Sequence, residues 1–206
     1  MTTILITGFR PFPGAPANPT AALATQLARA GRRRGITCVA HVFATTYAAV
    51  DRELPGLIAK HRPDAILMLG LAARRRHVSI ELFARNRMSA GFPDASGVVP
   101  PRAAIAAGAV AATRGRAEFS RLVAAARATR VTTRLSRDAG NYLCNYVYWR
   151  ALEAAAAPGG PRRAVFVHVP RVSPNAPRRG GARPPRFTLA QFLRVGEAIL
   201  VAVSRR

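Results

Sequence analysis

The chain alternates between short apolar runs rich in β-branched residues and longer amphipathic segments. The composition of the runs predicts strands at residues 3–7, 36–43, 64–71, 77–86, 131–134 and 164–169. The intervening periodicity predicts helices at residues 20–30, 47–61, 116–127, 140–157 and 188–204. Strands that alternate with helices form a largely parallel sheet covered on both faces. We therefore expect a three-layer α/β/α sandwich with a mostly parallel central sheet, as one domain over residues 1–206.

Helix caps and loops follow from the local sequence. Asn18 or Thr20 is expected to cap the first helix, with Pro19 in its first turn, and Asp138 is expected to cap the helix at 140–157. Residues 88–101 and 171–186 are rich in proline and glycine, which predicts two long loops.

Composition excludes several classes of protein. No apolar run approaches the roughly 20 residues that cross a bilayer, and the N-terminus lacks the basic start of a signal peptide. Cys38 and Cys144 are the only cysteines, too few for a disulfide scaffold in a chain of 206 residues. We therefore expect a protein of the reducing cytoplasm.

The formal net charge of +23 would ordinarily indicate nucleic-acid binding. Here the excess is almost entirely arginine, Lys60 being the only lysine, and it accompanies abundant alanine, as in GC-rich coding sequences. The arginines are spread along the chain and do not interleave with aromatic residues as in nucleic-acid modules. We expect no specific nucleic-acid partner, and at most weak polyanion binding.

A cysteine and a histidine stand where such a fold carries its chemistry. Sites in open α/β sheets lie beyond the carboxyl ends of the strands. His168 ends the apolar run at 164–169, and Cys144 follows the turn that opens the helix at 140–157. A helix N-terminus favours a thiolate, the reactive form of cysteine, and an adjacent imidazole can serve as its base. Alternatively, Cys144 is a buried structural thiol and His168 a core histidine.

Four blocks of sequence together resemble one known family. Residues 6–14 (ITGFRPFPG) with 18–20 (NPT) form the first block, and residues 70–72 (GLA), Arg75, 78–81 (VSIE), Ala84, Asn86 and 93–94 (PD) form the second. Ser136, residues 139–140 (AG) and 142–145 (YLCN) form the third, and 166–170 (FVHVP) forms the fourth. In this order they are similar to the motifs of type I pyroglutamyl peptidases, cytosolic cysteine peptidases that remove an N-terminal pyroglutamate.

The resemblance implies a phosphorylase/hydrolase-like α/β/α fold and a Cys-His-Glu triad of Cys144, His168 and Glu81. It implies Arg75 as a residue supporting the acid, and the following substrate-binding residues: Phe9, Phe12, Asn18, Leu71 and Leu143. The alternatives are a surface carboxylate for Glu81, loop packing for Phe9, Phe12 and Asn18, and a solvated arginine for Arg75.

Other chemistries lack their residue patterns. His41, His61 and His77 have no metal-ligand spacing among themselves or with cysteine, so we expect no metal site. Gly8 and Gly14 occur in no phosphate-binding motif, so we expect no cofactor. Cys38 lies in an expected core strand and is expected to be inert.

The chain departs from the family pattern at four positions. Leu71 stands in place of a glutamine, Leu82 and Gly91 in place of arginines, and Phe92 in place of a smaller aliphatic residue. The resemblance implies that the family's arginine at the place of Gly91 lies near the scissile carbonyl, and loss of one oxyanion donor costs roughly 10²–10³-fold in rate. Arg85 or Arg87 is a candidate replacement.

The sequence therefore predicts a cysteine exopeptidase that acts on peptides with an N-terminal pyroglutamate, with self-association into a homo-oligomer as a further expectation. The alternatives are a thiol hydrolase of the same fold that acts on another cyclic amide or acylated amine, and a weakly catalytic binding protein.

Overall fold

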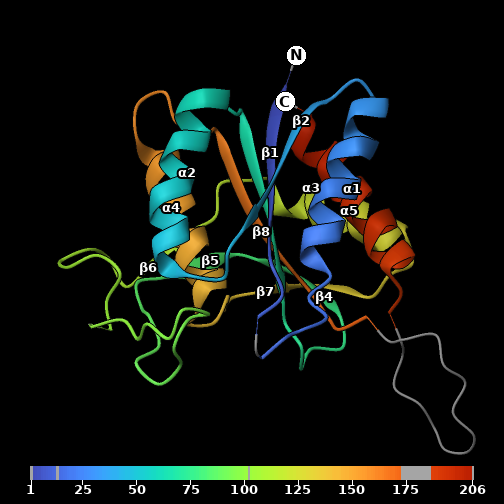
Figure 1. Cartoon of the computed structure of the whole chain (residues 1–206). Coiled ribbons are helices and arrows are strands. Elements are labelled where there is room, and N and C mark those ends of the chain that lie inside the picture. The colour runs from blue at the N-terminus through green and yellow to red at the C-terminus, as the bar shows by residue number, and fades with distance from the viewer. Residues whose placement is uncertain (1, 13, 102, 173–186, 206) are drawn as a thin grey trace, which may run out of the picture.

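A six-stranded sheet forms the centre of the computed structural model, which describes residues 2–12, 14–101, 103–172 and 187–205 (Figure 1). Its strand order is β2-β1-β3-β8-β4-β7. The strands are β1 (Thr3–Phe9), β2 (Thr37–Phe43), β3 (Ala65–Leu71), β4 (Val78–Glu81), β7 (Thr133–Ser136) and β8 (Arg163–Val169). The first four strands in this order are parallel, whereas β4 is antiparallel to β8 and parallel to β7. The prediction of a mostly parallel sheet is confirmed.

Helices cover both faces of this sheet. The helices are α1 (Thr20–Arg33), α2 (Tyr47–His61), α3 (Phe119–Ala128), α4 (Leu143–Ala156) and α5 (Leu189–Ser204). In Figure 1, α2 and α4 lie on the left of the sheet, and α1, α3 and α5 lie on its right. The expected α/β/α layering is thus confirmed. Among the described residues, no helix is long and apolar enough to cross a membrane.

Alternation along the strands divides the core into two layers. In β1, Ile4 and Ile6 pack with α1 and α5, whereas Leu5 packs with α2 and α4. In β8, Val165 and Val167 follow the first pattern, and Phe166 follows the second. Because successive side chains point to opposite faces, a side chain at an even-numbered position of β8 faces the α2/α4 layer. This rule decides where the site is built.

The expected strand at 77–86 is two strands in the structure. β4 ends at Glu81, and β5 (Phe83–Arg85) leaves the main sheet to pair with β6 (Ala112–Arg114), which the sequence did not reveal. The backbone of Leu82 is held on both sides of this bend, because its N–H donates to the carbonyl of Ser136 and its carbonyl accepts from Gly115. Such pairing is non-local, so the local composition of residues 77–86 could not indicate the break.

Both cap predictions were wrong in detail. α1 has Pro19 at its N-cap, and Asn18 instead accepts the N–H of Thr20 at 3.1 Å, one position earlier than a capping residue. α4 begins at Leu143 with Tyr142 at its N-cap, and Asp138 lies in the preceding loop. The Asp138 carboxylate accepts the N–H of Gly140 there, which stabilises the turn that precedes the helix.

The remaining differences concern element ends. α3 starts at Phe119 rather than at 116, because the backbone of Arg116 forms an antiparallel bridge with Ala164 and cannot join a helix. β7 lies two residues beyond the expected 131–134. Residues 88–101 form a loop as predicted, and most of the second predicted loop, 173–186, lies outside the described residues.

Candidate active site

Strand β8 carries His168 to the carboxyl edge of the sheet. The residue is the last but one of the strand and is almost fully buried. Its even position directs the side chain toward the α2/α4 layer, where the imidazole packs against Phe166 with ring centroids 4.8 Å apart. The β8 register therefore orients the ring toward the helix that carries Cys144.

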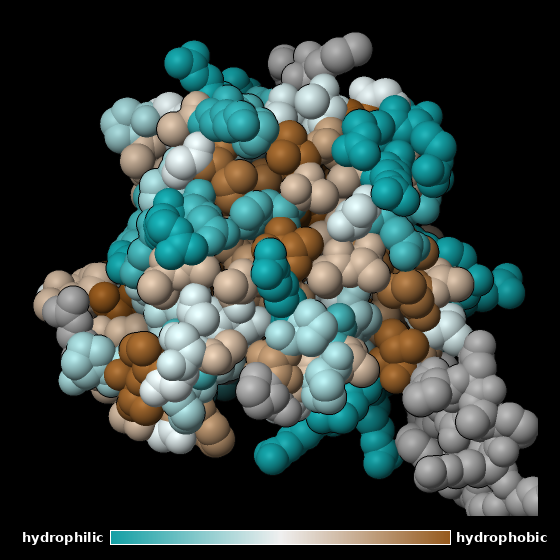
Figure 2. Space-filling model, viewed as in Figure 1, coloured by the Kyte–Doolittle hydropathy of each residue, from teal (hydrophilic) through white to brown (hydrophobic). Residues whose placement is uncertain are grey.

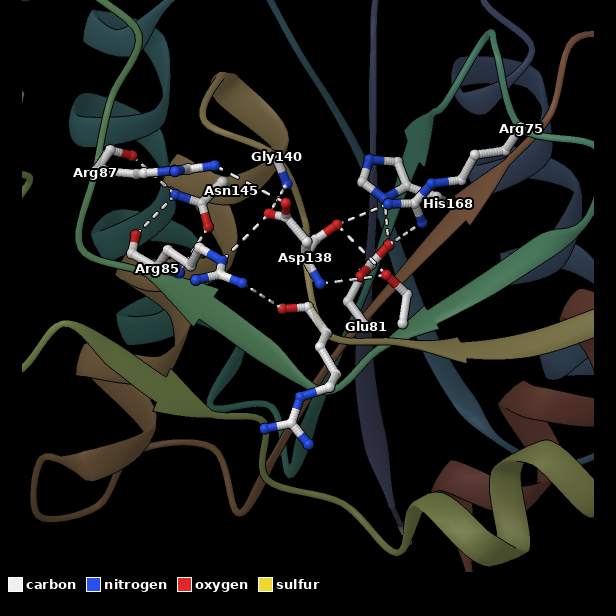
Figure 3. Close-up of polar contacts among 10 residues, drawn as sticks. Arg75, Glu81, Arg85, Arg87, Asp138, Gly140, Asn145 and His168 are labelled. Atoms are coloured by element: carbon white, nitrogen blue, oxygen red, sulfur yellow. Dashed lines mark hydrogen bonds and ion pairs between the residues drawn. The ribbon is translucent and has the colours of Figure 1, made fainter.

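Glu81, the last residue of β4, is wholly buried and lies beside this imidazole. Its Oε1 atom is 2.7 Å from Nδ1 of His168, a contact drawn in Figure 3. An ionised carboxylate only accepts hydrogen bonds, so Nδ1 carries the hydrogen and Nε2 is left as the basic nitrogen. The hydroxyl of Tyr148 on α4 donates to the Glu81 carbonyl at 2.9 Å, which ties the end of β4 to that helix.

Arg75 compensates the buried charge of Glu81. One guanidinium nitrogen of Arg75 donates to Glu81 Oε1, and the other donates to the carbonyl of Asp138 at 2.6 Å (Figure 3). A buried carboxylate needs such a partner, because removal of one side of a buried pair leaves an uncompensated charge. Arg75 is thus a partner of the acid and not a solvated arginine.

Asp138 connects this pair to two further arginines. Its carboxylate lies 3.3 Å from Nε of Arg85 and 3.8 Å from a terminal nitrogen of Arg87. Both side chains are therefore engaged by Asp138, as Figure 3 shows. Arg85 or Arg87 was a candidate to replace the positive charge missing at Gly91. To act on a substrate, either arginine would have to leave its ion pair with Asp138.

Cys144 is the second residue of α4 and is partly exposed. Its Sγ atom lies over Gly70, since a Cβ atom at Gly70 would come within 2.8 Å of the sulfur. Gly70 of β3 is the register partner of His168 of β8, and neighbouring positions in parallel strands point to the same face. The thiol and the imidazole therefore share one face of the sheet, on adjacent strands. A side chain at position 70 would also collide with the ring of Phe166, so the site requires glycine there.

The surroundings of Cys144 oppose ionisation of its thiol. Burial and then the negative charge of Glu81 raise the pKa of Cys144 to about 12, against weaker opposing effects of Arg75 and of the residue's own backbone N–H. The expectation that the helix N-terminus holds a thiolate at neutral pH was wrong, because desolvation outweighs the helix dipole at this position. The free protein carries a thiol that needs a base.

This raised pKa predicts the alkylation behaviour of Cys144. We expect its carbamidomethylation by iodoacetamide to rise about tenfold per pH unit between roughly pH 6 and pH 9, because the thiolate fraction grows in that way below the pKa. Peptide mapping after timed alkylation measures the rate at Cys144 separately from that at buried Cys38. A rate that already levels off below about pH 7 would show a low-pKa thiolate and contradict this expectation.

Asn145 is a structural partner of the site that the sequence analysis did not single out. It is fully buried, accepts the N–H of Arg85 at 2.8 Å, and donates to the carbonyls of Arg85 and Arg87. These bonds attach the segment after β5 to the first turn of α4, next to Cys144 (Figure 3). The signals in the sequence were its position beside the cysteine and its place in the third motif block, residues 142–145.

A small cavity of about 50 Å³ lies beside Cys144. It is lined by Phe9, Phe12, Asn18, Thr45, Leu71, Tyr142, Leu143 and Cys144. The structure thus brings all five expected substrate-binding residues together with the cysteine, and it adds Thr45 and Tyr142. The Asn18 amide is used within the loop, accepting from Thr20 and donating to the Arg10 carbonyl at 3.4 Å, so Asn18 braces the wall of the cavity.

The departures from the family pattern lie in different surroundings. Leu71 lines the small cavity, whereas Leu82 packs into the core layer of α1, α3 and α5, on the far side of the sheet. Gly91 is exposed, and its N–H donates to the Ser89 hydroxyl at 3.3 Å. A side chain at position 91 would meet nothing closer than that hydroxyl at 4.0 Å among the described residues. Of these three positions, only Leu71 lines the cavity beside Cys144.

A thiol at a helix start, an imidazole bound to a buried carboxylate, and a mostly parallel α/β/α framework are typical of cysteine hydrolases. Within the described part of the chain, no group of three histidine, cysteine or acidic residues could hold a metal ion.

Comparison with known proteins agrees with this class. The family model described as pyroglutamyl peptidase matches residues 2–206. A pyrrolidone-carboxylate peptidase of Gloeobacter violaceus is 34% identical over 197 residues, which are 96% of this chain and 94% of that one. One from Thermococcus kodakarensis is 32% identical over 81% of this chain and 80% of its own length. The chain belongs to the pyroglutamyl peptidase family, a family of cysteine peptidases.

Solved structures agree with the fold. A mutant pyrrolidone carboxyl peptidase from Pyrococcus furiosus superimposes with a TM-score of 0.85 at 28% identity, covering 98% of both chains. Pyroglutamyl peptidase I of Bacillus amyloliquefaciens gives a TM-score of 0.87 at 24% identity, over 100% of this chain and 98% of that one, which is a likeness of fold.

Proposed function

We propose that the protein hydrolyses the amide bond that follows an N-terminal pyroglutamate, with Cys144 as nucleophile, His168 as general base and acid, and Glu81 as the residue that orients His168. The observation that carries this proposal is the position of Cys144: it borders the small apolar cavity and shares a sheet face with the carboxylate-bound imidazole.

The raised pKa of the thiol defines the first step. His168 Nε2 takes the thiol proton as Sγ attacks the carbonyl carbon of the scissile amide, not that of the lactam ring. The S–C bond forms, and the carbonyl oxygen becomes an oxyanion. The C–N bond then breaks, and the imidazolium gives its proton to the leaving amine. Water, deprotonated by the same nitrogen, hydrolyses the thioester and releases pyroglutamate, and Sγ recovers a proton.

Glu81 acts in this cycle through the imidazole. Its contact with Nδ1 supports the tautomer that leaves Nε2 basic, and its charge stabilises the imidazolium that forms in both steps. Arg75 is the positioning partner whose guanidinium contacts the buried Glu81 carboxylate. Burial and then this carboxylate raise the pKa of Cys144 to about 12, so the thiol needs the imidazole as its base.

The start of α4 supports stabilisation of the oxyanion. The first backbone bond within this helix joins the Tyr146 N–H to the Tyr142 carbonyl, so the N–H groups of residues 143–145 have no acceptor within the helix. No side chain at the N-cap position accepts from these donors. Their partial positive charge beside Cys144 suits a developing oxyanion, and it does so without the arginine absent at position 91.

The cavity suits a small flat ring. At about 50 Å³ it is far smaller than sites for drug-sized ligands, which span roughly 300–1,000 Å³. Phe9, Phe12 and Tyr142 supply aromatic walls, Leu71 and Leu143 supply aliphatic ones, and Thr45 and Tyr142 carry hydroxyl groups. Pyroglutamate, a five-membered lactam, is the cyclic N-terminal residue that fits this combination. Homo-oligomerisation and a cytoplasmic location stay predictions.

The test compares pyroglutamyl and prolyl amides of one fluorogenic amine. We expect the pyroglutamyl amide to be hydrolysed with a kcat/KM at least about 10²-fold above that of the prolyl amide. The proline ring has no lactam carbonyl, so a site that forms hydrogen bonds with the lactam would lose those bonds when it binds the prolyl amide. Equal hydrolysis of the two amides would favour a thiol hydrolase of broader substrate range. Absence of hydrolysis of both would favour a binding protein.

A further inference from the structure

We propose that a groove adjoining the small cavity binds the side chain of the residue that follows pyroglutamate, and that it favours a large apolar or aromatic side chain there. This inference rests on the proposed function. The groove has a volume of about 510 Å³, and its walls include Phe12, Phe92, Pro93, Asp94 and Tyr142.

Continuity with the small cavity identifies the occupant. Phe12 and Tyr142 line both hollows, with ring centroids 6.3 Å apart. Pyroglutamate has no residue before it, so the only chain that continues from its carbonyl is the leaving peptide. A hollow that shares two aromatic walls with the ring cavity is therefore available to the first residue of that peptide.

The wall of the groove is apolar and exposed. Phe92 is 66% exposed, and Val98, Val99 and Val110 of the same loop are exposed as well. Figure 2 shows hydrophobic side chains gathered at the lower left of the molecule, over the loop between β5 and β6, to which Phe92 belongs. The neighbouring backbone is held in place, because the Tyr142 hydroxyl donates to the Pro93 carbonyl at 3.0 Å.

The one acidic residue among the described lining of the groove, Asp94, has its carboxylate bonded within its own loop. The carboxylate of Asp94 accepts hydrogen bonds from the N–H groups of Tyr47, Ser96 and Val98 and from the Ser96 hydroxyl. Burial opposes ionisation, yet these bonds together hold the pKa of Asp94 below its usual value. Asp94 thus braces the loop, because its buried carboxylate is already bonded to four donors of the protein.

Basic residues are also missing from this wall. The chain has 32 lysines and arginines, yet none is among the described residues that line the groove. A charged side chain in the leaving peptide would lose water without gaining a partner, whereas an aromatic one would cover the exposed ring of Phe92. The groove therefore selects by apolar surface and not by charge.

The test measures kcat/KM for pyroglutamyl-X amides in which X is Phe, Leu, Ala, Lys or Glu. We expect the Phe and Leu substrates to exceed the Ala, Lys and Glu substrates by about tenfold, the discrimination typical of an apolar subsite. Phe92→Ala should reduce the Phe-to-Ala ratio to about twofold, and Phe92→Leu should retain most of it. The matched control is Val110→Ala, in the same loop and also 66% exposed but outside the groove, which should keep the wild-type ratio.

Two outcomes overturn the proposal in different ways. If the Ala substrate is hydrolysed but the Phe-to-Ala ratio is near one, or is unchanged by Phe92→Ala, the groove does not bind this residue and the proposed function stands. If the wild-type protein hydrolyses none of the five substrates, the proposed function fails and the groove assignment fails with it.

Discussion

Cys144→Ala is expected to lower the kcat for a pyroglutamyl amide by at least about 10⁴-fold, because no other described group beside the cavity can form the thioester. The variant should remain folded, since the change removes a single small atom at a partly exposed helix start. The measurement is hydrolysis of the fluorogenic amide under substrate saturation, with thermal unfolding to show that the fold is retained.

Cys38→Ala is the matched control for this variant. Cys38 is 5% exposed, lies in β2 in the opposite core layer, and has its sulfur directed at Gly31 of α1. Burial raises the pKa of its thiol as well, against the weaker effect of Arg32, so it has neither access nor a base. The kcat of Cys38→Ala should therefore stay within about twofold of the wild-type value. Loss of activity in Cys38→Ala, or turnover within a factor of about ten in Cys144→Ala, would refute the assignment of the nucleophile.

Glu81→Gln should give the second-largest loss, about 10²–10⁴-fold in kcat with a much smaller change in KM. Glutamine keeps the shape of the side chain but removes the charge that stabilises the imidazolium. Its amide can also present an N–H to Nδ1 of His168, which favours the wrong tautomer. The contact between Glu81 and His168 strengthens as the imidazole gains the thiol proton, so its loss lowers kcat more than it changes KM. Steady-state kinetics on the pyroglutamyl amide separate the two constants.

Asp138→Asn provides the comparison for this second variant. It makes the same change of carboxylate to amide within the same network, but Asp138 contacts Arg75 through its backbone carbonyl, which the substitution leaves in place. We expect kcat within about threefold of wild type, since exposed ion pairs such as that with Arg85 contribute little. Equal losses in the two variants would mean that the network acts only by holding the fold together, and would remove Glu81 from the mechanism.

Much of the fold was predictable because the signals are local. The apolar runs of β1, β3 and β8 and the periodicity of α2 and α5 follow from residues near one another in the chain. The bend at Leu82 was missed and the start of α3 was misplaced, since backbone pairing with distant segments decides both. A local pattern contains no information about such partners.

Apart from β5 and β6, the sequence by itself determined the types and order of the elements, and its four motif blocks selected Cys144, His168 and Glu81 as candidates. Only the tertiary structure decided how these groups behave. The register of β3 against β8 sets Gly70 beside His168 and the Cys144 sulfur on the same face. Burial, together with Glu81, makes that sulfur a neutral thiol instead of the thiolate expected at a helix start. The physical reason is that desolvation and charge pairing depend on contacts between residues far apart in the chain, whereas strand and helix preferences depend on neighbours along it.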